Sequence, residues 1–292
     1  MTSGEFKTRP KYSFSARGKT LELGTRTRIM GVINMTPDSF SDGGNYNNLD
    51  SALERCLSLL EAGADILDIG GESSRPGSDP VTADEEIDRI LPLIEKIRPE
   101  TEGFLSVDTC KSKVAEAALE AGADIVNDIT ALAHSSNMAD LVREKDAGII
   151  LMHMRGEPAT MHLMAPSEDI IREVTEGLRF SVDKAVRAGI PRDRIILDPG
   201  IGFGKNHREN LELINRMPML AGLDLPLLVG TSRKRFIGAV LDRPVSERLY
   251  GTIASSVAAI LKGAHILRVH DVGEVREAAM VADAVVMENL IQ

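Results

Sequence analysis

The sequence has 292 residues, a formal net charge of -10 and only 3% aromatic residues, with no tryptophan. No run of Lys and Arg is present, which argues against a nucleic-acid surface, because such a surface needs clustered cations. Cys56 and Cys110 have no His or Cys at metal-ligand spacing, so we expect reduced thiols and no zinc site. There is neither a signal-peptide pattern nor an apolar run long enough to span a bilayer, so we expect a cytoplasmic protein that acts on small molecules.

The first predicted element is a β-hairpin. It covers residues 12–23, with Arg17, Gly18 and Lys19 as the turn. We expect this part of an N-terminal extension, residues 1–27, to cover the N-terminal end of the structure that follows.

Eight short apolar runs, rich in Leu and β-branched residues, predict buried strands. They lie at residues 28–34, 65–69, 103–107, 124–127, 148–152, 194–197, 226–229 and 265–269. Amphipathic segments between them predict helices, for example at residues 49–62, 82–97, 111–121, 167–188 and 245–262.

A repeated unit links these helices to the strands. The string AGADI occurs at residues 62–66 and again at 121–125, with weaker echoes at 146–149 and 262–266. Its Gly is typical of a helix C-terminal cap, and the apolar run after it is typical of a buried parallel strand. Repetition of this half of a β/α unit predicts a (β/α)8 TIM barrel that forms a single domain over residues 1–292. The alternative is an open doubly wound sheet, but the first strand is not followed by a G-x-G-x-x-G turn.

Polar residues gather at the predicted C-terminal ends of the strands, where barrel enzymes carry their active sites. The successive strands end at or near Asn34, Asp68, Asp108, Asn127, His153, Asp198, Lys234 and His270. Any one of these could be structural; Asp108 could cap a helix and Asp198 could shape a turn. Eight such ends at one rim indicate a site instead.

The sequence allows two roles for several of the rim residues. Lys234 could be a Schiff-base lysine or a hydrogen-bond donor to an electron-rich ring. We favour a ligand contact for His270 and a packing role for His153. The Gly-rich loop at residues 70–77, which contains Arg75, favours an anion site, and the loop at residues 36–44 favours a lid.

Five strings resemble dihydropteroate synthase. They are GVINMTPDSFSDGG at residues 31–44, DIGGESSRPG at 68–77, DPGIGFGK at 198–205, SRK at 232–234 and RVHDV at 268–272. The resemblance runs in order from about residue 28 to the C-terminus. It implies a homodimeric transferase of folate biosynthesis that joins 6-hydroxymethyl-7,8-dihydropterin diphosphate to p-aminobenzoate and releases pyrophosphate, from a family that is the target of sulfonamides.

The resemblance also implies a role for each matching residue. The implied pterin contacts are Asp108, Asn127, Met152, Asp198, Lys234 and Arg268. The implied diphosphate contacts are Asn34, Arg75, Arg268 and His270, with Asn34 also binding Mg²⁺. The implied p-aminobenzoate contacts are Phe40, Ser74, Pro76, Phe203 and Arg235. Asp42, Arg75 and Lys234 are implied to act in a dissociative mechanism assisted by Mg²⁺, in which the Asp42 carboxylate stabilises a pterin methylene cation.

Other classes of function remain open at this point. A pterin-dependent methyltransferase shares the barrel and the pterin-edge carboxylates, but it would not need Arg75. A Schiff-base aldolase would use Lys234, and an inactive relative would bind a pterin without turnover. Many relatives have Thr where this chain has Ser74, which leaves the affinity for sulfonamides open.

Overall fold

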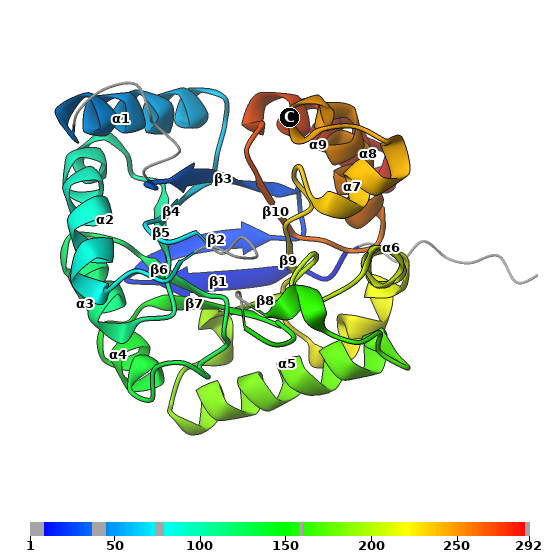
Figure 1. Cartoon of the computed structure of the whole chain (residues 1–292), viewed down its shortest axis with the longest axis horizontal. Coiled ribbons are helices and arrows are strands. Elements are labelled where there is room, and N and C mark those ends of the chain that lie inside the picture. The colour runs from blue at the N-terminus through cyan, green and yellow to red at the C-terminus, as the bar shows by residue number, and fades with distance from the viewer. Residues whose placement is uncertain (1–8, 37–44, 74–78, 158–159, 290–292) are drawn as a thin grey trace, which may run out of the picture.

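The structure is a computed structural model that describes residues 9–36, 45–73, 79–157 and 160–289, and it contains a barrel of parallel strands surrounded by helices (Figure 1). The strands are β1 (Tyr12–Ala16), β2 (Lys19–Leu23), β3 (Arg28–Asn34), β4 (Ile66–Gly70), β5 (Phe104–Asp108), β6 (Ile125–Asp128), β7 (Gly148–Met152), β8 (Ile195–Asp198), β9 (Leu228–Val229) and β10 (Ile266–Val269). The α-helices are α1 (Asn45–Glu61), α2 (Ala83–Ile97), α3 (Ser112–Glu120), α4 (Met138–Glu144), α5 (Ile170–Arg187), α6 (His207–Arg216), α7 (Arg235–Leu241), α8 (Leu249–Leu261) and α9 (Val272–Met287). Short 3-10 helices lie at Arg98–Glu100, Met161–Leu163, Arg192–Arg194, Met217–Leu223 and Val245–Glu247.

The parallel strands close into a ring. Their order is β8-β7-β6-β5-β4-β3-β10-β9, and every hydrogen-bonded pair in this sheet is parallel. A parallel bridge between Leu197 and Leu227 joins the two ends, and Leu197 N–H donates to the Pro226 carbonyl at 2.9 Å. The predicted TIM barrel is therefore confirmed, and the open doubly wound sheet is not formed.

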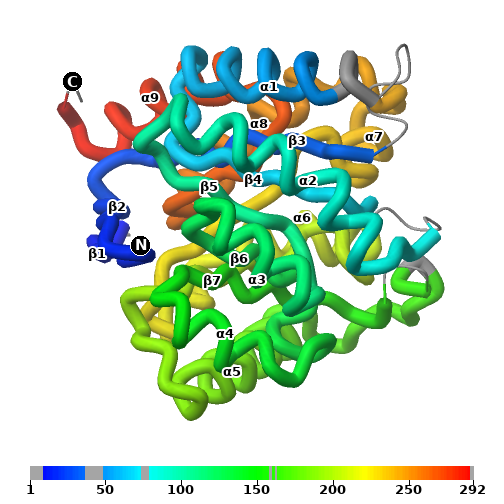
Figure 2. Tube along the Cα trace, turned by 90° about the vertical axis from the view of Figure 1, so that its left-hand side faces the viewer, coloured from blue at the N-terminus to red at the C-terminus, as the bar shows by residue number. Residues whose placement is uncertain are grey.

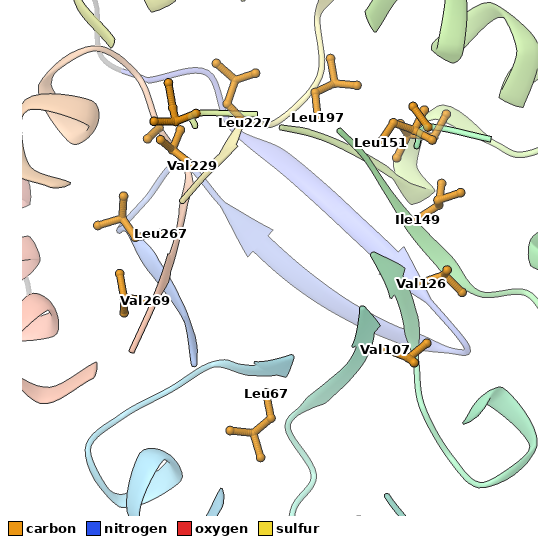
Figure 3. Close-up of a cluster of buried hydrophobic side chains, with 14 of the residues drawn as sticks. Leu67, Val107, Val126, Ile149, Leu151, Leu197, Leu227, Val229, Leu267 and Val269 are labelled. Carbon is orange, nitrogen blue, oxygen red and sulfur yellow. The ribbon is translucent and has the colours of Figure 1, made fainter. Parts of the chain in front are cut away.

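Side chains alternate between the two faces of each strand, as the extended backbone requires. The outward set, which includes Leu67, Val107, Val126, Leu151 and Leu267, lies between the strands and the helices (Figure 3). The inward set begins with an apolar layer at the N-terminal end of the barrel. This layer consists of Met30, Ile66, Phe104, Ile125, Ile150, Ile196, Leu228 and Ile266.

The predicted hairpin covers this apolar layer. β1 and β2 pair in antiparallel register from Tyr12–Leu23 to Ala16–Lys19, and Figure 2 shows them across one end of the barrel. Phe14 and Leu23 are buried and belong to the same cluster as the layer. The hairpin thus seals the N-terminal end of the barrel, as the sequence predicts.

Helix ends follow the chemistry expected of their sequences. Thr82 caps α2 in a capping box with Glu85, which satisfies backbone N–H groups that the first turn leaves without partners. Gly63 and Gly122 of the repeated AGADI unit have φ of 94° and 111°, values that a glycine adopts without steric strain.

Most predicted bounds differ from the structure by a few residues at one or both ends, and two of these differences change the element itself. The strand expected at residues 226–229 is reduced to Leu228–Val229, since Pro226 has no N–H to donate to a ladder. The helix expected at residues 245–262 begins as a separate 3-10 turn, Val245–Glu247, and α8 starts at Leu249. No helix in the described ranges is long and apolar enough to cross a membrane.

Phe14→Ala tests the hairpin seal. Phe14 is 1% exposed, so its truncation leaves a cavity against the apolar layer, and we expect a loss of about 3 to 5 kcal/mol in the free energy of unfolding, measured by urea denaturation. Phe180→Ala on α5 is the matched control, because Phe180 is 72% exposed, and it should change stability by less than about 0.5 kcal/mol. Equal effects of the two changes would contradict the sealing role.

Candidate functional site

A polar pocket opens at the C-terminal end of the barrel. It is lined by Asp108, Asn127, Ile129, Met152, Asp198, Ile201, Phe203, Gly230, Lys234 and Arg268. All six residues that the resemblance implies for pterin contact line this pocket, although they come from five strands and a loop. Strand alternation explains the convergence, because inward positions near the ends of neighbouring parallel strands face the same space.

Arg268 is the centre of an ion-pair network in the pocket. Its Nε donates to Asp68 Oδ2 and its Nη2 to Asp108 Oδ2, both at 2.6 Å. Asn127 Nδ2 donates to the same Asp68 oxygen at 3.1 Å. Asp68 is fully buried, and its other oxygen has no hydrogen-bond partner in the structure. One buried carboxylate therefore holds both the Arg268 guanidinium and the Asn127 amide.

This network determines what the pocket offers to a ligand. Because the Asn127 amide nitrogen bonds to Asp68, its carbonyl oxygen is left as an acceptor for another group. Arg268 occupies only one oxygen of Asp108. Together with Asp198, these side chains present acceptors to a ligand that carries several N–H donors.

Burial shifts the protonation of the acidic pocket residues. It raises the pKa of Asp108 to about 7, against the opposing charge of Arg268, and it also raises the pKa of Asp198. Asp198 Oδ1 in addition accepts from Gly200 N–H at 2.7 Å, so the expected turn role is present alongside the pocket role.

Lys234 supplies the cation at the other side of the pocket. It precedes α7 in the loop after β9, and its Nζ lies 4.2 Å from the centre of the Phe203 ring. Burial, reinforced by the charge of Arg268, lowers the pKa of Lys234 to about 8. The amine remains largely protonated at neutral pH, which suits a hydrogen-bond donor.

His270 lies beside the pocket, near the end of β10. Ser232 Oγ accepts from the His270 backbone N–H at 3.3 Å and lies 2.9 Å from the ring Nδ1, within hydrogen-bonding distance. Burial, helped by the charge of Arg268, lowers the pKa of His270 to about 4. In the tautomer in which Nδ1 accepts from the Ser232 hydroxyl, the neutral His270 ring presents an Nε2–H donor. It also borders a second hollow with Arg55 and the start of α9.

Other predicted site residues are not among those that line the pocket. Asn34 ends β3 at the same rim and is partly buried, and Arg235 is exposed at the start of α7. Phe40, Asp42, Ser74, Arg75 and Pro76 lie outside the described residues. Their assigned roles stay predictions.

Two interpretations of rim residues are clarified by their contacts. Asp108 does not cap α3, whose N-cap residue is Lys111 without a side-chain hydrogen bond. His153 is absent from the pocket lining, and its Nδ1 is buried without a partner, in keeping with the packing role we favour. Asp128, also at the rim, accepts from Thr130 and Leu132 and shapes the loop after β6.

Asp68 lies buried beneath the pocket, where it contacts Arg268 and Asn127, and the sequence placed it at the rim without a specific role. A charged residue inside the apolar run of β4, between Leu67 and Ile69, was the available signal. Buried charges are rare unless they are paired, so this position predicts a partner, but the sequence does not reveal that the partner is Arg268, 200 positions later.

The family is decided by comparison with known proteins. A model described as "Pterin binding enzyme" matches residues 30–270. This chain belongs to the pterin binding enzyme family. Within the family it is 45% identical to dihydropteroate synthase of Synechocystis sp., over 91% of this chain and 93% of the relative.

Solved structures of dihydropteroate synthases share its fold. The Yersinia pestis enzyme, in a sulfonamide drug complex, is 41% identical with a TM-score of 0.88, over 94% of this chain and 98% of that one. The Xanthomonas albilineans enzyme with 4-aminobenzoic acid is 40% identical with a TM-score of 0.88 and the same coverage. A structure of the latter enzyme also holds 7,8-dihydropteroate.

Lys234→Ala tests the pterin pocket. Lys234 is the pocket's predicted donor, so its loss should raise the Kd for a pterin by about 100-fold or more in calorimetry. Because burial disfavours its charge, removal should leave the thermal midpoint close to that of the unmodified protein. The control is Lys113→Ala, a largely exposed lysine of α3. Unchanged pterin affinity in a folded Lys234→Ala protein would contradict the assigned role.

Proposed function

We propose that this protein is a dihydropteroate synthase, a transferase that condenses 6-hydroxymethyl-7,8-dihydropterin diphosphate with p-aminobenzoate. The products are 7,8-dihydropteroate and pyrophosphate, and the reaction belongs to folate biosynthesis. The observation that carries the proposal is the pocket itself, in which every implied pterin residue converges although these residues are spread from Asp108 to Arg268.

The chemistry of the pocket matches a pterin edge. A reduced aminopyrimidinone ring carries several N–H donors and a carbonyl acceptor. Asp108, Asn127 and Asp198 can accept from the donors, while Lys234 can donate to the carbonyl. Arg268 and Met152 are then placed to contact the faces of the ring.

The charges of the pocket also suit the proposed dissociative step. Burial raises the pKa of Asp108 and of Asp198, and a positive charge that forms beside these two residues favours their ionised forms. Loss of pyrophosphate from the pterin methylene leaves a cation that is delocalised into the ring. An acidic, preorganised pocket stabilises that charge as it develops. The amine of p-aminobenzoate then attacks the methylene carbon.

Magnesium is part of the proposal. Among the described residues, no three His, Cys, Asp or Glu side chains are grouped to hold a metal. Asn34 offers one amide oxygen at the rim, a donor set that fits Mg²⁺, because this ion commonly takes one or two protein oxygens together with phosphate oxygens and water. Bound there, Mg²⁺ would neutralise charge on the departing diphosphate. The Nε2–H of His270 and the Arg75 side chain would contact the same phosphates.

The remaining assignments concern the second substrate and its mimics. Phe203 at the pocket wall, with Phe40, Ser74, Pro76 and Arg235, would bind p-aminobenzoate. Sulfonamides would compete for this position, and the related enzymes with bound 4-aminobenzoic acid and sulfonamide support this assignment. We further propose that the protein acts in the cytoplasm.

Pyrophosphate release tests the proposed reaction. We expect release only when the pterin diphosphate, p-aminobenzoate and Mg²⁺ are all present, and chelation of Mg²⁺ should abolish it. Lys234→Ala serves as the inactive control. A folded protein that releases no pyrophosphate would refute the assignment, and methyl transfer from a methylated pterin would favour the methyltransferase instead.

A homodimer is also proposed, through the apolar face of α8 and α9. These helices lie side by side (Figures 1 and 2) and expose large apolar side chains. The exposed residues include Tyr250, Leu261, Met280, Val281 and Val285, with exposures from 45% to 82%. An exposed apolar patch of this kind is typical of a protein interface.

Val281→Glu tests this interface. A carboxylate buried between two copies would be strongly disfavoured, so the mass measured by light scattering after size exclusion should fall to that of one chain. Phe180→Glu on α5 is the control, because Phe180 is exposed to a similar extent, 72% against 67%, and α5 lies across the barrel from α9 (Figure 1), so this change should keep the dimer mass. A monomeric unmodified protein would refute the dimer.

A further inference from the structure

Lys205 lies in the loop between β8 and α6 and is almost fully buried, with 8% exposure. Its Nζ donates to three backbone carbonyls, those of His153 at 3.0 Å, Gly200 at 2.9 Å and Phe203 at 3.0 Å. An ammonium group has three N–H donors. All three donors of Lys205 therefore bind the backbone.

The backbones around Lys205 pack unusually closely. Gly200 and Gly204 have φ of 68° and 66°, in the left-handed region. A Cβ at Gly200 would lie 1.9 Å from the His153 carbonyl oxygen, and one at Gly204 would lie 2.2 Å from the Arg155 carbonyl oxygen. The loop after β8 is thus pressed against the loop after β7, and carbonyl groups from both converge on one buried point. The Lys205 ammonium neutralises these converging dipoles.

The same loop forms one wall of the pterin pocket. Asp198 begins it, and Ile201 and Phe203 line the pocket. The Phe203 ring lies under the Lys234 ammonium, and the position of a Cβ on Gly202 would be 3.0 Å from Lys234 Cδ. A shift of the loop would therefore move both the wall and the lysine that rests on it.

We propose that Lys205 is a positioning residue of this site, whose ammonium fixes Phe203 and the backbone after Asp198 in the arrangement that binds the pterin and supports Lys234. The proposal builds on the pterin pocket of the proposed function. It assigns Lys205 no contact with a substrate.

The electrostatics of Lys205 support a specific role for its charge. Burial lowers the pKa of Lys205 to about 7, so holding the proton in this place costs free energy. A neutral apolar side chain of similar length would avoid that cost, but it could not bind the three carbonyls. The three hydrogen bonds, together with the opposite charge of Asp198, explain a lysine here.

A single-tryptophan reporter tests the position of the wall. The chain contains no tryptophan, so Phe203→Trp places the only such fluorophore in the pocket wall. In the ligand-free protein, we expect Lys205→Met in this background to move the emission to longer wavelength, because the released wall becomes more exposed to water. Lys113→Met, a change of a largely exposed lysine, is the matched control and should leave the emission unchanged.

Binding provides the second measurement, made with Phe203 in place. Lys205→Met should raise the Kd for 6-hydroxymethylpterin about 10-fold or more, while Lys113→Met keeps the Kd of the unmodified protein. A folded Lys205→Met protein with unchanged emission and unchanged Kd would overturn the proposal. If Lys205→Met does not fold, Lys205→Gln, which retains an N–H donor, is measured in the same way, and the same two outcomes decide.

The two hypotheses fail separately. The emission experiment needs no substrate, so its result does not depend on the reaction. Absence of pyrophosphate release with a shifted emission would refute the proposed function and leave the positioning role intact. Pyrophosphate release, with an unshifted emission and an unchanged Kd in Lys205→Met, would support the proposed function and refute the positioning role.

Discussion

The inward-facing alternation of eight parallel strands is the constraint on which both the fold and the site depend. Most strands are short and carry only two or three inward side chains. In most of them, an apolar inward side chain lies near the start of the strand and a polar one lies near its end. The first positions form the floor that the hairpin seals, with Ile66 and Phe104 as examples. The second positions, such as Asp68 and Asn127, lie directly above this floor. The binding pocket therefore rests on a packed core, and loop residues such as Phe203 and Lys234 complete its walls.

Placing polar groups above an apolar floor has an electrostatic consequence. Charged groups there lose much of their hydration, which raises the pKa of Asp108 and lowers that of Lys234. Arg268 compensates Asp68 and Asp108 through two short hydrogen bonds. A ligand that binds Asp108 must either use its second oxygen or displace one Arg268 donor. Ligand binding in this pocket therefore involves an exchange of polar contacts rather than the filling of an apolar cavity.

Much of this arrangement could be predicted from the sequence because it is local. The strand at residues 28–34 and the one at 148–152 match the structure at both ends, since an apolar run and its flanking residues determine them. The polar ends of the strands could be placed at one rim without coordinates, because parallel strands point the same way. Closure of the barrel through the bridge between Leu197 and Leu227 depends on neighbours that are distant in sequence. No local pattern contains that information.

The contacts that tune the site were beyond sequence reasoning for the same reason. Asp68 and Arg268 are 200 positions apart, and either one alone is compatible with many partners. Lys205 ends the glycine-rich string of residues 198–205, where the sequence indicates only a tight loop. Its three acceptors include His153, which belongs to a different β/α unit. Residue types at strand ends therefore reveal what kind of ligand a barrel can bind, whereas the accuracy with which it holds the ligand depends on buried contacts between units that are far apart in the chain.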